Sequence, residues 1–419
     1  MDASIAPPAK AGARAGIVGA ADIDLDRVRA TLMVLGIALH AADVFLTTGD
    51  WLVADPHRSA GFDALVALIH SFRVPGFFLL SGLFFAGSLA RHGAPDLLMR
   101  QLLRLGLPLL TCWVLLNGAQ QALLAWHRGA DAWTAALASA PMYHLWFLYD
   151  LLILNLLVLA GVTLRRGPAT RRERREHRTT QNSRTRGPLR RACTRVMTAL
   201  GSQGPAHWLT VALCGALLSH ALLVAVRLTG VAYVEGPGGV SLFSLAFQAP
   251  MFLAGLAFSR RPAWLAAWLR TPGWLLPLAA VASSWGDGAS DTLASALARE
   301  AALAVQLLGI WIATGAAVGG LGRLRRGAAR SRAGRMLSEA SYTIFLVHHL
   351  VVVALALLLL PHDWPALLKF AFIAAGTLAL SLAFHHWLVR PFATMRLLLN
   401  GRGASPAEEH STAATPGRA

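Results

Sequence analysis

The sequence is poor in cysteine and in charged residues. Its three cysteines, Cys112, Cys193 and Cys214, are too few for a disulfide framework and lack the spacing of a metal site. Only 14% of the residues are charged, whereas 55% are hydrophobic. These shortages argue against a soluble domain and against a fold held by disulfides or zinc. They indicate a membrane protein, with the lipid bilayer as its first partner.

No cleavable signal peptide is expected, because the first twenty residues have no apolar core followed by a small-residue cleavage site. Ten apolar segments further along are near the length that a spanning helix needs. We therefore expect an all-α, polytopic membrane protein of about ten transmembrane helices. The seventh segment contains Pro272, Gly273 and Pro277, which fit a kinked helix or a re-entrant element instead of a full span. The segments are 28–47, 62–88, 101–124, 144–164, 206–228, 241–258, 263–284, 297–320, 337–360 and 366–388.

Acidic residues are also scarce, and the excess of arginine and lysine gives a formal net charge of +17. No folded basic surface with base-reading or stacking groups accompanies this charge, so no nucleic acid partner is expected. Instead, basic clusters occupy every second connection between segments, which predicts that both termini are cytoplasmic. The basic clusters are Arg91 to Arg104, Arg165 to Arg195, Arg260 and Arg261, Arg323 to Arg335, and Arg390 and Arg396; acids in the other connections include Asp50, Asp131, Glu235, Asp287 and Asp291.

Two tails bound the predicted membrane domain, and a polar loop without apolar periodicity lies within it. Residues 1–23 and 401–419 are expected to be disordered tails, and residues 165–203 a basic cytoplasmic loop. Twelve arginines lie between Arg165 and Arg195, so this loop fixes orientation, with anionic lipid binding as a secondary role. The membrane domain is therefore predicted to cover residues 24–400.

The first apolar segment carries the best candidates for chemistry. Arg29 and His40 are eleven positions apart, which places them on one face of a helix and about 16 Å apart along its axis. Arg29 at the cytoplasmic edge can hold phosphates, and His40 near the bilayer centre can take a proton from a hydroxyl. Asp43, one turn later, can orient the His40 ring. The alternative readings are a packed histidine and an arginine that only anchors the helix.

The second segment contains Arg73 at a depth similar to that of His40, so the two groups are expected to share a cavity. Pro75 and Gly76 follow Arg73 and can disrupt the helix locally. Ser81, further along the same segment, is a candidate substrate-binding residue. Its structural alternative, together with Gly82, is a small residue at a helix contact.

Two later segments add histidines. His144 opens the fourth segment and is a candidate for substrate binding, whereas the nearby Trp146 is expected to be an interfacial anchor. His348 and His349 are adjacent in the ninth segment and about 100° apart around a helix, so the two cannot both point at one cavity centre. We favour His348 for the site.

These motifs together resemble the acyltransferase 3 family of integral membrane O-acyltransferases. The likeness rests on the Arg29-x10-His40 pair, FRVPGFFLLSG at 72–82, HLWFL at 144–148 and SYTIFLVHH at 341–349, in the family's order. It covers residues 24–400. Within the family, the segments 341–349 and 389–401 are most similar to members associated with succinylation of periplasmic glucans.

The resemblance implies a bacterial inner-membrane enzyme that moves an acyl group, acetyl or succinyl, from cytoplasmic acyl-CoA to a hydroxyl of an envelope carbohydrate. Acyl-CoA is then the donor substrate, and no bound cofactor or metal is implied. His40 matches the family's essential histidine and Arg29 its paired arginine. Whether His40 acts as a general base or carries the acyl group stays open. The acyl group, the acceptor and the oligomeric state also stay open.

Two other classes of function fit the residues alone. Many spans with buried charges are equally typical of a secondary transporter or a flippase of a lipid-linked glycan. A non-catalytic subunit of an envelope complex is a third reading. Acyl-CoA hydrolysis or acyl transfer by the purified protein separates these classes from an acyltransferase.

Overall fold

The computed structural model describes residues 24–49, 51–130, 134, 141–165, 207–230, 241–292, 294–324 and 332–403. Within these ranges the chain is helical and has no strand, as the sequence predicts. The predictions for residues 1–23, for 166–203 and for 404–419 lie outside the described residues. The membrane domain is thus seen as a set of packed helices.

Helices occupy nearly all of the predicted apolar segments, because each segment is long, apolar and largely free of internal breakers. One predicted span, 101–124, lies in a continuous helical run that includes two π-helical turns. The elements are α2 Leu25–Asp43, α3 Ala60–Arg91, α4 Ala94–Gln101, η1 Leu102–Gly106, α5 Leu107–Cys112, η2 Trp113–Asn117, α6 Gly118–His127, η3 Tyr143–Leu145, α8 Trp146–Arg165, α11 His207–Leu228, α12 Leu242–Arg260, α13 Pro262–Trp268, α14 Leu275–Thr292, α15 Ala296–Leu324, α16 Arg332–Leu359, α17 Ala366–Phe384, η6 His385–Val389 and α18 Ala393–Asn400.

Eight helical runs in the described residues are long and apolar enough to cross a membrane, so the chain is a multi-pass membrane protein. The first predicted span, α2, is not among the eight, and it carries Asp26, Arg27 and Arg29 in its first turns. The segment 263–284 does not form one helix. It is divided between α13 and α14 by a turn that contains Pro272 and Gly273, which remove a backbone donor and weaken the helix.

The helix α3 continues through Pro75, although the sequence predicts a local disruption there. A proline inside a long apolar helix is tolerated where neighbouring helices support the segment. That support is close, since a Cβ added to Gly82 would lie 2.1 Å from the Phe252 carbonyl oxygen of α12. A Cβ on Gly255 of α12 would likewise lie 2.2 Å from the Leu79 carbonyl oxygen. Gly82 is therefore a helix-contact residue, as the structural alternative proposed.

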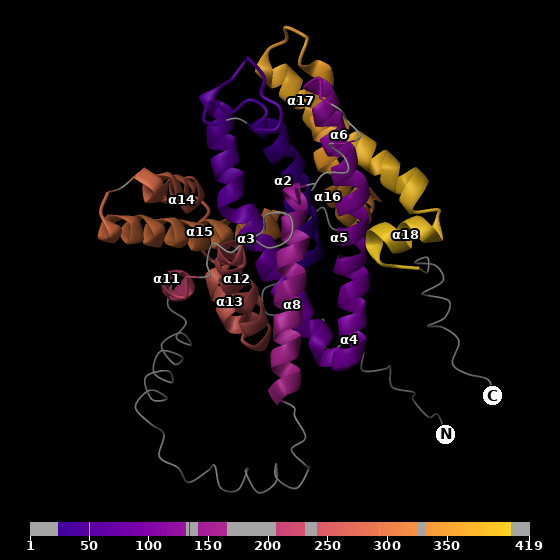
Figure 1. The fold of residues 1–419 in the computed structure, drawn as a ribbon. Coiled ribbons are helices and arrows are strands. Elements are labelled where there is room, and N and C mark those ends of the chain that lie inside the picture. The colour runs from indigo at the N-terminus through magenta and orange to yellow at the C-terminus, as the bar shows by residue number, and fades with distance from the viewer. Residues whose placement is uncertain are drawn as a thin grey trace, which may run out of the picture.

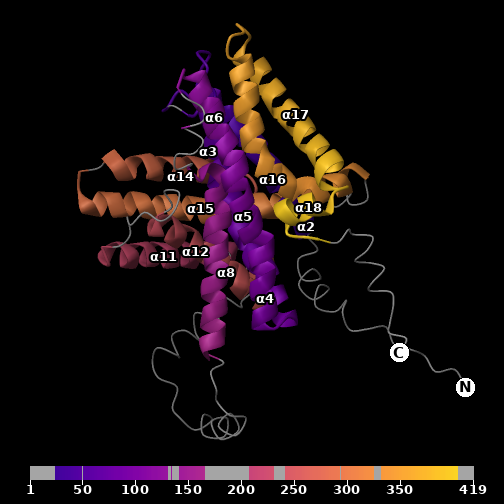
Figure 2. The same ribbon diagram turned by 45° about the vertical axis from the view of Figure 1, so that its right-hand side comes forward.

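The helices α2 and α3 lie at the centre of the fold. The first packs against α3, α16 and α17, and the second against α12, α14 and α15. Figures 1 and 2 show α11, α12, α14 and α15 side by side, running across the direction of α8 and of the run α4 to α6. The first group is α11, α12, α14 and α15, and the second is α8 with the run α4 to α6. Residues from the two groups meet at the centre.

Candidate functional site

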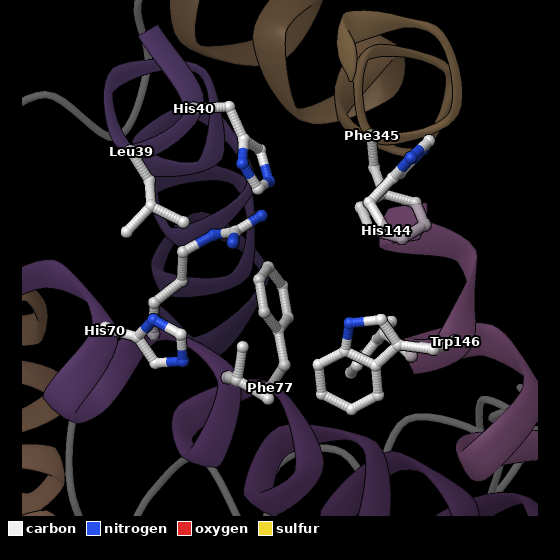
Figure 3. Close-up of a pocket in the computed structure, with 10 residues that line it drawn as sticks. Leu39, His40, His70, Phe77, His144, Trp146 and Phe345 are labelled. Carbon is white, nitrogen blue, oxygen red and sulfur yellow. The ribbon is translucent and has the colours of Figure 1, made fainter. Parts of the chain in front are cut away.

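A pocket opens where α2 and α3 face the start of α8 and the middle of α16. Its cavity has a volume of about 80 Å³. Figure 3 shows the rings of His40 and His70 on one side and those of His144, Trp146 and Phe345 on the other. The wall is mostly apolar, so the polar groups in it stand out. The lining residues are Leu39, His40, His70, Arg73, Val74, Phe77, His144, Trp146, Phe147 and Phe345.

His40 and Asp43 meet, as their spacing predicts. The Nδ1 atom of His40 lies 2.9 Å from Oδ2 of Asp43. A carboxylate oxygen accepts, so Nδ1 carries the proton and Nε2 keeps a free electron pair. Both side chains are largely buried, at 15% and 11% exposure. This arrangement holds the imidazole in the form that can take a proton from a hydroxyl.

Arg73 shares the pocket with His40, and the cause of its placement is Gly36. The Arg73 side chain is only 5% exposed and crosses α2 at Gly36, where an added Cβ would lie 2.2 Å from Nη2. Its Nε donates to the Leu32 carbonyl oxygen at 3.2 Å, and its guanidinium lies 6.0 Å from the centre of the Phe77 ring. No carboxylate in the described part of the chain forms an ion pair with it. The pocket therefore has a positive charge that can face a negative oxygen.

Arg29 lies near the start of α2, outside the pocket. It is half-buried, 3.7 Å from Asp26, and its guanidinium lies 5.7 Å from the centre of the Phe84 ring. On the α2 surface Gly36 follows Arg29 by seven positions and precedes His40 by four, so all three share one face. Arg73 crosses that face at Gly36, which places it between Arg29 and His40.

His348 and His349 both contact His40. The ring centres of His40 and His348 are 5.4 Å apart, and those of His40 and His349 are 4.8 Å apart. His144 joins them, at 5.1 Å from His348 and 4.8 Å from His349. The two adjacent rings point in different directions, at 88° to each other, yet the cluster is wide enough to include both. The sequence argument therefore missed His349.

Polar side chains of the run η2–α6 hold this histidine cluster in place. Asn117 Nδ2 donates to the Pro141 and Met142 carbonyl oxygens, at 2.9 and 3.0 Å, and so fixes the turn that precedes His144. Gln120 Oε1 lies 2.8 Å from His349 Nδ1. Both amides are buried in an otherwise apolar segment. Neither amide was proposed from the sequence, although an amide inside an apolar segment is a signal that could have found them.

The remaining predicted residues are placed differently. Ser81 lies about 12 Å further along α3 than Arg73, by helix rise, and does not line the pocket. Trp146, which was predicted to be an interfacial anchor, lines the pocket. His70, which was not proposed as a site residue, also lines it and is exposed.

The connection between α2 and α3 covers the His40 end of α2. Within it, Trp51 stacks on His40 with ring centres 6.0 Å apart and packs edge-on against His349. Asp55 is 2% exposed and lies 2.5 Å from Nζ of Lys369, which is 1% exposed and belongs to α17. The Asp55 carboxylate also accepts from the His57 backbone N–H at 2.9 Å. This buried ion pair ties the connection to α17.

The chemistry of the site follows from these contacts. One pocket with mostly apolar walls contains an imidazole whose Nδ1 donates to Asp43 and a guanidinium that has no ion-pair partner among the described residues. Such a site can take a proton from a hydroxyl and stabilise a developing negative oxygen. Within the described residues no group of histidine, cysteine or acidic side chains is placed to hold a metal ion.

Comparison with known families gives the same assignment as the sequence motifs. The sequence model of the acyltransferase domain of the acyltransferase 3 family matches residues 22–386. The chain belongs to the acyltransferase 3 family. It is a membrane acyltransferase by that membership.

Relatives of this acyltransferase are proteins named Glucans biosynthesis protein C. Those of Escherichia coli strains SMS-3-5 and K12 are each 32% identical to it over 142 residues. The matched stretch covers 32% of this chain and only 37% of each relative. No solved structure matches the chain.

Proposed function

We propose that the protein transfers an acyl group from cytoplasmic acyl-CoA to a hydroxyl of an envelope carbohydrate at the bacterial inner membrane. The observation that carries the proposal is the His40–Asp43 contact of 2.9 Å beside Arg73 in one pocket. An acceptor hydroxyl gives its proton to His40 Nε2 as its oxygen attacks the thioester carbonyl carbon. The carbon–sulfur bond then breaks, and the proton passes to the departing thiolate.

Asp43 and Arg73 have separate tasks in this reaction. The Asp43 carboxylate orients the imidazole and stabilises the imidazolium that forms when Nε2 takes the proton. The Arg73 guanidinium faces the negative oxygen of the tetrahedral intermediate. Because both lie in a mostly apolar pocket, their effect on the reaction is larger than in water.

The donor is proposed to enter from the side of Arg29. Coenzyme A carries phosphates, and a guanidinium binds phosphate through paired hydrogen bonds. Arg29 and His40 are separated by about 16 Å along α2, with Arg73 between them. An extended thioester arm can span that distance, so phosphates at Arg29 and a carbonyl near His40 are compatible.

The proposal of a carbohydrate acceptor rests on the relatives named Glucans biosynthesis protein C. It is supported by the setting of His40, which stacks on the indole ring of Trp51. Aromatic rings present an apolar face with a polar edge, which suits a ligand that has both C–H and O–H groups.

The decisive experiment uses purified protein in detergent with acetyl-CoA or succinyl-CoA and a glucan acceptor. Free thiol and acylated glucan are measured together. His40→Ala is expected to reduce transfer at least 100-fold, because general base catalysis contributes about 10²- to 10⁴-fold. Asp43→Asn is expected to retain binding of both substrates and to lower the rate at least tenfold.

His220→Ala is the matched control, since His220 lies on α11 and pairs with Glu300 at 2.7 Å, away from the pocket. Full transfer by His40→Ala contradicts the mechanism. If the unchanged protein moves an unmodified glycan across a vesicle membrane and releases no thiol, the result favours a transporter over an acyltransferase.

A further inference from the structure

We propose that His144 and His348 bind a second hydroxyl group of the acceptor beside His40, so that the acceptor is a compound with neighbouring hydroxyls. This proposal rests on the proposed function and adds the substrate feature that the site recognises. The position of the proton on each imidazole ring decides which nitrogen is free to accept a hydrogen bond.

The proton of His348 is held by its own helix. Nδ1 lies 2.7 Å from the Phe345 carbonyl oxygen and 3.1 Å from that of Ile344. A carbonyl oxygen only accepts, so Nδ1 is the donor and Nε2 has the free electron pair. Nε2 is buried and has no hydrogen-bond partner in the described part of the chain, and the side chain is 0% exposed.

His144 has the same arrangement with its nitrogens exchanged. Its Nε2 lies 3.2 Å from the Leu346 carbonyl oxygen, so Nε2 carries the proton. Its Nδ1 is then an acceptor, and it too is buried without a partner within the described residues. The His144 ring is 7% exposed and lines the pocket that contains His40.

Three imidazoles, each with one nitrogen free to accept, therefore form one cluster, and His40 and His144 of this cluster line the pocket. His348 lies between the other two, with ring centres 5.4 Å from His40 and 5.1 Å from His144. Buried acceptors without donors are rare in folded proteins, and the two in these contacting rings can each accept a hydrogen bond from a bound molecule. Rings bonded to backbone carbonyls cannot readily exchange their tautomers to become donors here.

A molecule that binds to these two nitrogens must supply hydrogen-bond donors. A carbonyl, carboxylate or phosphate oxygen is repelled by the electron pairs of His144 and His348, so the oxygens of the donor substrate do not bind these two nitrogens. An alcohol hydroxyl donates one hydrogen bond, and a compound with neighbouring hydroxyls can give one to His40 Nε2 and another to His144 or His348. A water molecule satisfies the same acceptors and is the alternative that the experiment must separate.

The test compares acceptors and variants by steady-state transfer from acetyl-CoA. The probes are methyl β-D-glucopyranoside, its monodeoxy derivatives and cyclohexanol. With the unchanged protein, the glucoside is expected to have a lower KM than at least one monodeoxy derivative and than cyclohexanol. His144→Phe and His348→Phe are each expected to raise the KM for the glucoside about tenfold while leaving the KM for cyclohexanol within about twofold.

Conservative variants separate binding from packing. His348→Gln and His144→Asn put an amide oxygen near the place of the histidine nitrogen that was free to accept. Both variants are expected to recover most of the glucoside affinity. His220→Phe is the matched control. A glucoside KM that does not change in either Phe variant, or an equal rise for cyclohexanol, overturns the proposal and leaves only ordered water at this place.

A binding measurement with the glucoside tests the proposal without turnover. Trp51 and Trp146 lie beside the histidines, so titration with the glucoside is expected to change tryptophan fluorescence. If the unchanged protein shows no transfer but binds the glucoside, and His348→Phe weakens that binding, the result contradicts the proposed reaction and supports this site. An active protein in which both Phe variants bind as before contradicts this site alone.

Discussion

Gly36 decides where the positive charge of the pocket lies. The Arg73 guanidinium fills the space that a side chain at Gly36 would need, with an added Cβ only 2.2 Å from Nη2. Since α2 has no side chain there, Arg73 can reach the face that connects Arg29 with His40. A glycine in a helix interior costs stability, and here it is explained by this close approach.

Gly36→Ala is expected to lower acyl transfer at least tenfold by moving the guanidinium away from the reacting oxygen. The far end of an arginine can shift, so the unfolding midpoint is expected to change little. The transfer rates of Gly36→Ala, Arg73→Lys and the double variant form a double-mutant cycle. Either substitution is expected to lower the rate much less when the other is already present.

Gly161→Ala is the control for this cycle, because a Cβ at Gly161 of α8 would meet no atom within 4 Å. Additive losses from Gly36→Ala and Arg73→Lys contradict the role given to Gly36.

At the level of single residues, the sequence predicted those contacts of the site that form within one helix. The contact between His40 and Asp43 follows from helical spacing alone. The place of His349 in the cluster was not predicted. The angle between adjacent residues gives the direction of each side chain, but it does not tell how many side chains from other helices surround His40. Trp51 did not follow either, since a connection between helices has no periodicity to locate its side chains.

Among the elements, the connection between α2 and α3 carries the buried ion pair that joins it to α17. Asp55 and Lys369 pair at 2.5 Å with almost no exposure. Removing one member leaves an uncompensated charge, which costs about 3–5 kcal/mol. The pair thereby fixes the connection that carries Trp51 over His40.

Lys369→Met is expected to lower the unfolding midpoint strongly in thermal denaturation in detergent. Adding Asp55→Asn removes the orphaned charge, retains an acceptor for the His57 backbone N–H and is expected to restore most of the loss. Asp24→Asn is the control, because Asp24 is half-exposed and its pair with Arg27 is worth about 0–1 kcal/mol. An equal shift in the control and in Lys369→Met contradicts the importance of burial.

For the whole molecule, the property to measure is which helices cross the bilayer. Eight runs in the described residues qualify by length and composition, and α12 is one of them. Yet α12 belongs to the group that runs across the direction of α8 and of the run α4 to α6 (Figures 1 and 2). Charge alternation predicts that its two ends lie on opposite sides of the membrane.

Reporter fusions test this topology. Alkaline phosphatase is expected to be active when fused after residue 128 or 230, and inactive after residue 164, 260 or 400. A fluorescent protein that folds only in the cytoplasm should show the reverse pattern. Equal phosphatase activity after 230 and 260 contradicts a crossing by α12, and activity after 400 contradicts a cytoplasmic C-terminus.

The sequence by itself determined the helical membrane class, the family and the pairing of His40 with Asp43. These depend on hydropathy and on helix periodicity, which are local properties of the chain. The tertiary structure decided which side chains join them, because packing of separate helices brings distant residues together. His144, for example, contacts the Leu346 carbonyl oxygen 202 positions away, and that contact fixes which of its nitrogens is free.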